Sequence, residues 1–240
     1  MNRRTALGLL AAGLLSACGG GGGGGAGLAT GPGQASAPLA AAFAGSADIA
    51  AWGDSHTSGL PGNDAVPGYA PMLARIAQGR VVFDGGVAGQ TSTQIADRQV
   101  RDDAHDDWIS VFWYGGNNES QPEQIKADLA RSIASLAPGN GRFIVLSVVN
   151  QASPWERRGS DGYRTIVALN QELARLYPDN FIDIRSELVG LYDPSNPLDV
   201  VDFQDDVPPT SLRADGVHLN AAGAMAVAQR VMAFIAAKGW

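Results

Sequence analysis

The sequence has few of the residues that several classes of protein require. It contains one cysteine, Cys18, so no disulfide can form within the chain. Its 17 Lys and Arg residues are outnumbered by 24 Asp and Glu residues, which gives a formal net charge of -7, and no basic cluster compensates locally. Because a protein that binds nucleic acid needs a basic face against the phosphates, no nucleic-acid partner is expected.

Metal ligands are also scarce. The three histidines are widely separated along the chain, and the best group of ligand residues is "DDAHDD" (102–107). A metal-dependent hydrolase needs His, Cys, Asp or Glu side chains that converge on one point. We interpret this segment as a solvated loop, with a metal site as the alternative, and we expect neither a metal nor another cofactor.

The N-terminal segment is typical of an export signal. "MNRR" is basic, and the apolar stretch "ALGLLAAGLLSA" has twelve residues, too few to span a bilayer comfortably. It ends in "LSAC", which resembles the lipobox of bacterial lipoproteins, where the cysteine becomes the lipidated first residue of the mature chain. The resemblance implies a signal peptide over 1–17 and an exported protein anchored to a membrane through Cys18, with Gly19 favouring the outer membrane. An unmodified thiol is the alternative.

A long stretch without charged residues follows Cys18. It begins with seven consecutive glycines and continues in Ala, Gly, Ser and Pro to about residue 46. Such a composition cannot build a packed core, so we expect a flexible tether over 18–46. The remainder of the chain, 47–240, is long enough for one globular domain, and the chain as a whole is 45% hydrophobic.

From residue 47 onward, short apolar runs alternate with amphipathic stretches. The runs predict strands over 47–52, 80–84, 108–114, 142–149 and 180–184. Apolar residues at helical spacing predict helices over 69–78, 92–99, 122–136, 163–177 and 220–238. This alternation indicates an α/β fold with a parallel sheet of about five strands and helices on both of its faces.

Four polar or glycine-rich segments follow these strands or open the last helix. They are "GDSHTSG" (53–59), "GGVAGQTS" (85–92), "GGNN" (115–118) and "DGVHLN" (215–220). The first three stand at carboxyl ends of strands, where the sites of parallel sheets form. In the fourth, Asp215 and His218 are three residues apart, so the carboxylate can hold one imidazole nitrogen while the other faces outward. Each segment alone also fits an ordinary turn or cap.

The ordered combination of the four segments resembles the SGNH (GDSL-type) hydrolase family over roughly 47–238. The resemblance implies a three-layer α/β/α sandwich and a serine esterase without a cofactor. It implies Ser55 as nucleophile and Asp215 and His218 as the rest of the triad. It implies three oxyanion-hole donors, which are Gly89, Asn117 and the backbone N–H of Ser55.

Two positions depart from the pattern of that family. His56 stands where the first block commonly has leucine, and we interpret it as a partly exposed turn residue, with a catalytic role as the alternative. Asn118 stands where the third block commonly has a supporting aspartate. The second departure leaves the reaction in place but puts the fine positioning of the site in question.

The substrate is the least determined feature. After residue 46 there is no long apolar insertion that could form a lipase lid, so we expect short acyl groups, acetyl first, on a carbohydrate or other polar alcohol. Trp155 and Tyr163 are expected near the cleft. A lipase, general carboxylesterase or thioesterase is the alternative within the family. A carbohydrate-binding lipoprotein without catalysis, in which Trp113, Tyr114 and Trp155 stack on sugars, is the alternative from another class.

Overall fold

The computed structural model describes residues 45–240, so the expected signal peptide, Cys18 and nearly all of the tether lie outside the described residues. The domain is built on a parallel sheet of five strands in the order β4-β1-β5-β6-β7. Its strands are β1 (Ile49–Gly53), β4 (Val82–Gly86), β5 (Ile109–Trp113), β6 (Phe143–Leu146) and β7 (Phe181–Ile182). The predicted fold class, an α/β sandwich with about five parallel strands, is confirmed.

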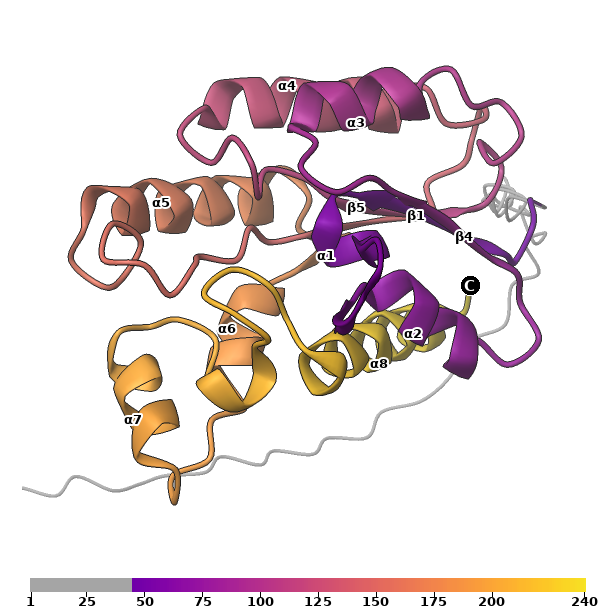
Figure 1. The fold of residues 1–240 in the computed structure, drawn as a ribbon. Coiled ribbons are helices and arrows are strands. Elements are labelled where there is room, and N and C mark those ends of the chain that lie inside the picture. Colours follow the sequence, from indigo (N-terminus) through magenta and orange to yellow (C-terminus); the bar gives the residue numbers. More distant parts are fainter. Residues whose placement is uncertain (1–44) are drawn as a thin grey trace, which may run out of the picture. The chain divides into compact units, whose positions relative to one another are not determined.

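Helices cover both faces of the sheet (Figure 1). One face carries α3 (Ser92–Gln99), α4 (Pro122–Ala134) and α5 (Asp161–Leu176). The other carries α2 (Tyr69–Ile76), α6 (Ile184–Gly190) and α8 (Ala221–Lys238). Successive strand residues point to opposite faces, so Val111 packs with α2 and α8 while Phe112 packs with α3 and α4. This is why the central strands carry apolar residues on both faces instead of at alternate positions only, with the buried Ser110 of β5 as an exception.

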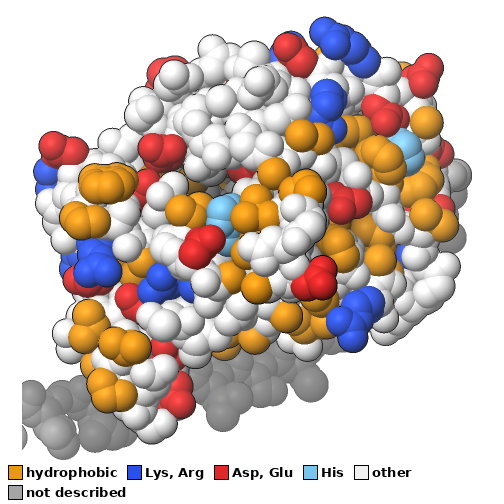
Figure 2. Space-filling view, viewed as in Figure 1, with side chains coloured by type: hydrophobic (Ala, Val, Ile, Leu, Met, Phe, Trp, Pro, Cys, Tyr) orange, Lys and Arg blue, Asp and Glu red, His pale blue; other side chains and the backbone are white. Residues whose placement is uncertain are grey.

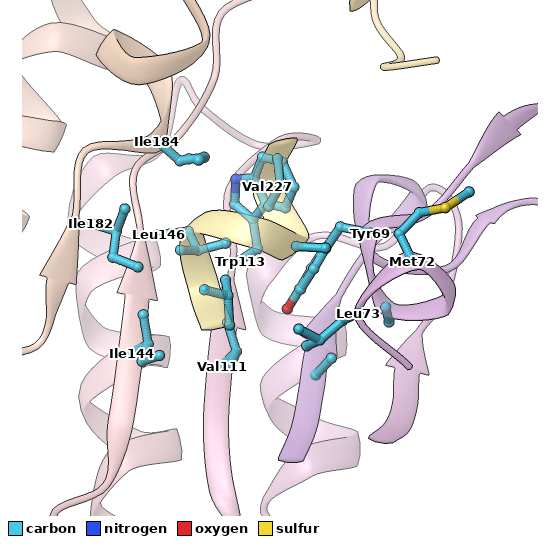
Figure 3. Close-up of a cluster of buried hydrophobic side chains, with 14 of the residues drawn as sticks. Tyr69, Met72, Leu73, Val111, Trp113, Ile144, Leu146, Ile182, Ile184 and Val227 are labelled. Carbon is cyan, nitrogen blue, oxygen red and sulfur yellow. The ribbon is translucent and has the colours of Figure 1, made fainter. Parts of the chain in front are cut away.

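The core beside α2 and α8 is shown in Figure 3. Tyr69 and Leu73 of α2 and Val227 of α8 are fully buried there against strand residues such as Val111 and Leu146. α8 is the one helix among residues 45–240 whose length and composition would allow it to cross a membrane. Its buried residues pack in this core, so we describe it as a core helix of the domain.

Two of the expected strands are clearly shorter in the structure, and the one expected over 142–149 is only Phe143–Leu146. The expected strand over 180–184 is only Phe181–Ile182, because Asp183 accepts a hydrogen bond from the Ser186 N–H and caps α6. Besides α6, five short elements were not predicted at all. They are α1 (Ser55–Ser58), the hairpin β2 (Gly59–Leu60) and β3 (Asn63–Pro67), α7 (Pro197–Gln204) and the 3-10 turn η1 (Thr210–Leu212).

The order of the strands places the site. β1 lies between β4 and β5, with Gly53 level with Gly86 on one side and Trp113 on the other. The chain therefore leaves three neighbouring strands at one edge, in segments 54–58, 87–91 and 114–118. From β1 the chain continues to β4 on one side and then to β5 on the other. In parallel sheets such a change of direction opens a crevice at the carboxyl ends of the strands.

Candidate active site

Ser55 begins α1 directly after β1. The Asp54 carboxylate caps this short helix by accepting the His56 N–H at 2.9 Å, which turns the chain sharply as it leaves the sheet. Ser55 is 6% exposed, and its Oγ lies 3.1 Å from Nε2 of His218. The hydroxyl is thus within hydrogen-bonding distance of His218, a base 163 positions later in the chain.

His218 is held by Asp215 in the loop that enters α8. Nδ1 of His218 lies 2.9 Å from Oδ2 of Asp215, while Oδ1 accepts the N–H of Val217 and of His218 at 2.7 Å each. The loop is closed at its base by the Ala214 N–H, which donates to the His218 carbonyl at 2.9 Å. The imidazole therefore has one nitrogen on a carboxylate and the other on a hydroxyl.

The carboxyl group of Asp215 is stabilised as an anion. Partial burial alone would raise its pKa, but the hydrogen bonds from the His218 N–H, the His218 ring and the Val217 N–H outweigh that effect and lower the pKa below the ordinary value. An ionised Asp215 favours the tautomer of His218 that carries its proton on Nδ1. That tautomer leaves Nε2 free to accept the Ser55 proton.

The expected oxyanion donors differ in their availability. Among residues 45–240, no group accepts the N–H of Ser55 or of Gly89, and Gly89 has φ +78 with open space where a side chain would stand. Asn117 already uses both hydrogens of its amide, toward Oδ2 of Asp54 at 3.1 Å and the Gln90 carbonyl at 3.0 Å. The two backbone N–H groups are free to donate to a ligand. The Asn117 amide must first give up its hydrogen bond to Asp54 or to Gln90.

Asn118 is buried and binds the first residue of α3, Ser92, through both ends of its amide. Its Oδ1 accepts the Ser92 N–H at 3.0 Å, and its Nδ2 donates to Ser92 Oγ at 2.9 Å. Ser92 Oγ donates in turn to Oδ2 of the buried Asp128 on α4, at 2.7 Å. The Asp128 carboxylate is thus two hydrogen bonds from Asn118, through Ser92, and the segment that carries Asn117 is tied to the start of α3.

His56, expected as a partly exposed turn residue, is of intermediate exposure and lies in the short helix α1. Its side chain is 10% exposed and packs against Trp113, with the ring centroids 4.9 Å apart. The His218 ring is 5.9 Å away. Asp54 is buried, and Gly116 lies so close to its carboxylate that a side chain at position 116 would not fit. No sign of these contacts was present in the sequence beyond the segment "GDSH" itself.

Only one of the aromatic residues expected to meet sugars is exposed. Trp113 and Tyr114 are 4% and 1% exposed and belong to the core, so the stacking interpretation is wrong for both. Tyr163 donates its hydroxyl to Asp206 at 2.7 Å and has the guanidinium groups of two arginines over its ring, Arg158 and Arg185. Trp155 is 66% exposed.

The "DDAHDD" segment is a capped turn. Asp102 accepts from Nδ1 of His105 at 2.7 Å and from two backbone N–H groups, and the His105 ring stacks on Phe83. Across residues 45–240, no three His, Cys, Asp or Glu side chains are grouped so that they could hold a metal ion. Lys and Arg side chains are scattered on the face shown in Figure 2 and do not gather in one patch.

The chain belongs to the GDSL-like Lipase/Acylhydrolase family, whose model matches residues 51–226. The match covers the segments that hold Ser55, Gly89, Asn117, Asp215 and His218. This is the family that the ordered segments predicted.

Known proteins are similar to this chain in sequence or in fold. The tail spike protein of Salmonella phage epsilon15 is 28% identical over 149 residues, which are 57% of this chain and 14% of the tail spike, so the chain spans only a small part of that relative. A lipase/acylhydrolase from Enterococcus faecalis has a TM-score of 0.58 at 17% identity, covering 80% of this chain and 97% of the other. The acetyl xylan esterase AlAXEase has a TM-score of 0.60 at 15% identity, covering 78% and 98%. At these identities the two structures show the shared fold.

Proposed function

We propose that the protein hydrolyses carboxylic esters through an acyl-enzyme on Ser55. His218 accepts the proton of Ser55 Oγ as that oxygen attacks the ester carbonyl, and the ionised Asp215 stabilises the imidazolium. The negative oxygen of the tetrahedral intermediate is stabilised by the N–H groups of Ser55 and Gly89 and by Asn117, once its amide releases the Gln90 carbonyl. His218 then protonates the leaving alcohol, and water repeats both steps on the acyl group.

The observation that supports this mechanism best is the continuous chain of contacts from Asp215 through His218 to Ser55, at 2.9 Å and 3.1 Å. Ser55→Ala and His218→Ala are each expected to lower kcat by at least about 10³, and the double variant by no more than either alone, because the two residues act as a unit. Steady-state hydrolysis of an aryl acetate measures this. Labelling by a fluorophosphonate should require both residues, and full activity of Ser55→Ala would refute the mechanism.

We also propose that the acyl group is short, acetyl first, and that the alcohol is a carbohydrate or similarly polar. Among the four site segments, the exposed large apolar side chains are Val87 and Val217, which offer little apolar area to a long acyl chain. Each buried methylene is worth about 0.8 kcal/mol, so an enzyme selective for long chains needs far more apolar surface. The acetyl xylan esterase among the similar structures supports the same substrate class.

Trp155 supports the carbohydrate part of the proposal. The loop that carries it is tied to the catalytic segment, because the Ala152 N–H donates to the Gly216 carbonyl at 2.8 Å. Its indole is 66% exposed, and an exposed aromatic face on an ordered loop can stack on a sugar ring. Trp155→Ala should raise KM for an acetylated polysaccharide several-fold and leave kcat/KM for an aryl acetate within about twofold.

The substrate is tested by a series of aryl esters and by acetate release from acetylated polysaccharides. We expect kcat/KM to fall from acetyl to octanoyl esters and acetate to be released from the polymer. A steady rise toward octanoyl with no acetate released would establish a lipase or general carboxylesterase instead. Preference for an acyl thioester over the matching ester would establish a thioesterase, and binding of the glycan without turnover would establish a binding protein.

The location of the enzyme is a proposal from the sequence alone. The "LSAC" segment and the glycine-rich stretch after it support an exported bacterial lipoprotein, tethered through Cys18 to a membrane and to the outer one by preference. A tether of about 28 residues has a root-mean-square span of about 30 Å. The enzyme would then act on esters within that range of the membrane surface.

A further inference from the structure

His56 makes a contact with the catalytic loop that has no counterpart in a leucine. It lies on α1 immediately after Ser55, and its Nε2 is 3.2 Å from the carbonyl oxygen of Val217. The two residues are 161 positions apart. The contact therefore joins the helix that carries the nucleophile to the loop that carries the base.

The chemistry of the two atoms decides the direction of this hydrogen bond. A carbonyl oxygen can only accept, so Nε2 of His56 must carry a hydrogen and donate it. Trp113 packs against the imidazole ring and limits its rotation, at a centroid distance of 4.9 Å. The 10% exposed side chain is thus held in one orientation, with its donor aimed at Val217.

The accepting carbonyl belongs to the peptide group between Val217 and His218. The N–H of that same peptide group donates to Oδ1 of Asp215 at 2.7 Å. The peptide plane is consequently fixed at both ends, by the carboxylate of Asp215 and by the imidazole of His56. Because this plane sets the backbone direction at His218, it also sets where the His218 ring points.

We propose that His56 is a positioning residue, which orients His218 toward Ser55 by holding the Val217 carbonyl. This inference rests on the serine mechanism proposed above. Val217 and Gly216 are exposed, so burial does not fix the loop, which is held by hydrogen bonds such as that from the Ala152 N–H to the Gly216 carbonyl. A displacement of about 1 Å between reacting groups can cost about 10² in rate.

Three variants separate the hydrogen bond from the volume of the side chain. His56→Gln can place an amide N–H near the position of Nε2, whereas the shorter His56→Asn places its donor near Nδ1, toward Asp54 and away from Val217. His56→Leu has an apolar side chain of similar size without a donor. We expect His56→Leu and His56→Asn to lower kcat for an aryl acetate about 10- to 100-fold with KM within about twofold, and His56→Gln to recover most of the loss.

Two controls accompany these measurements. His105→Gln removes a histidine outside the site and should leave kcat unchanged, and thermal unfolding of every variant shows that the compared proteins are folded at the assay temperature. The rate of labelling by a fluorophosphonate should follow kcat, because it reports activation of Ser55. His56→Gln and His56→Asn form a matched polar pair if the leucine variant fails to fold.

The outcomes distinguish this inference from the mechanism beneath it. Wild-type kcat in His56→Leu, or equal losses in the Gln and Asn variants, would overturn the positioning role while Ser55→Ala remains inactive. Activity in Ser55→Ala would instead overturn the proposed mechanism itself. Recovery by Gln but not by Asn supports the hydrogen bond to Val217.

Discussion

At the scale of single residues, the site depends on which hydrogen bonds are already made before substrate arrives. Both oxygens of Asp215 already accept hydrogen bonds, from two backbone N–H groups and one imidazole nitrogen. The N–H groups of Ser55 and Gly89 have no acceptor among residues 45–240. The orienting carboxylate is thus preorganised, and the backbone donors remain open for the charge that develops on the substrate.

Asp215→Asn should leave the fold intact and lower kcat by about 10² to 10⁴. The amide keeps the size of the side chain, but it removes the charge that stabilises the imidazolium and can hold His218 in the wrong tautomer. Steady-state kinetics with an aryl acetate measures the loss, and circular dichroism serves as the control for folding. Unchanged kcat in this variant would mean that Asp215 only caps the loop.

The pH dependence follows from the same pair. The lowered pKa of Asp215 means that its hydrogen bonds support the folded site at every pH above the unfolded carboxyl pKa, and that this support is lost only as the pH falls through the still lower folded value. A neutral Asp215 no longer stabilises the imidazolium, so kcat/KM should decrease as the pH falls through the lowered pKa of Asp215. A pH profile of kcat/KM measures this decrease, and circular dichroism at each pH shows whether the domain is still folded.

At the scale of elements, α7 has an inverted pattern of polarity. Its acidic residues Asp199 and Asp202 are buried, while Leu198 and Val201 are 61% and 49% exposed. Asp199 accepts from the Ser211 N–H at 2.9 Å, and Asp202 pairs with Arg213 at 2.6 Å. The helix therefore holds the segment that leads to Asp215 through charges, which is why apolar periodicity did not predict it.

α8 provides a test of how closely that segment packs. Gly223 lies in the first turn of α8, where a Cβ would stand 2.4 Å from the Leu212 carbonyl oxygen. In an exposed helix, Gly→Ala stabilises by roughly 0.5–1 kcal/mol, but Gly223→Ala should destabilise the domain, by about 1–3 kcal/mol, because η1 must move. Denaturant unfolding measures this change.

Gly190→Ala is the matched control. Gly190 ends α6, and nothing lies within 4 Å of the place where its Cβ would stand. This variant should be neutral or slightly more stable. If Gly223→Ala behaves in the same way, the close packing of α8 on the catalytic segment does not limit stability.

At the scale of the whole molecule, the proposed anchor separates location from catalysis. Cys18→Ser removes the only thiol in the chain and should release the protein from the membrane fraction, because the serine hydroxyl is not the lipidated group that a lipobox requires. The specific activity of the released protein should equal that of the wild type. Cell fractionation with activity assays measures both, and a variant that is processed normally and stays with the membrane would contradict the lipoprotein proposal.

Strand and helix alternation was readable from the sequence because buried parallel strands such as Ile109–Trp113 are mostly apolar on both faces and the helices between them are amphipathic. The grouping of Ser55, Asp215 and His218 was predicted from the resemblance of their ordered segments to the SGNH family. Short elements such as α1 and α7 were not, since four or eight residues held by caps and charges carry no clear period.

The sequence by itself therefore determined the fold class and the segments that meet at the sheet edge. Three features were decided only by the tertiary structure. The Asn117 amide donates to Asp54 and Gln90, Trp113 lies in the core, and His56 contacts Val217. The physical reason is distance along the chain. Periodicity and spacing report contacts within a helix, a strand or a turn, whereas a hydrogen bond across 161 positions depends on how the finished layers pack.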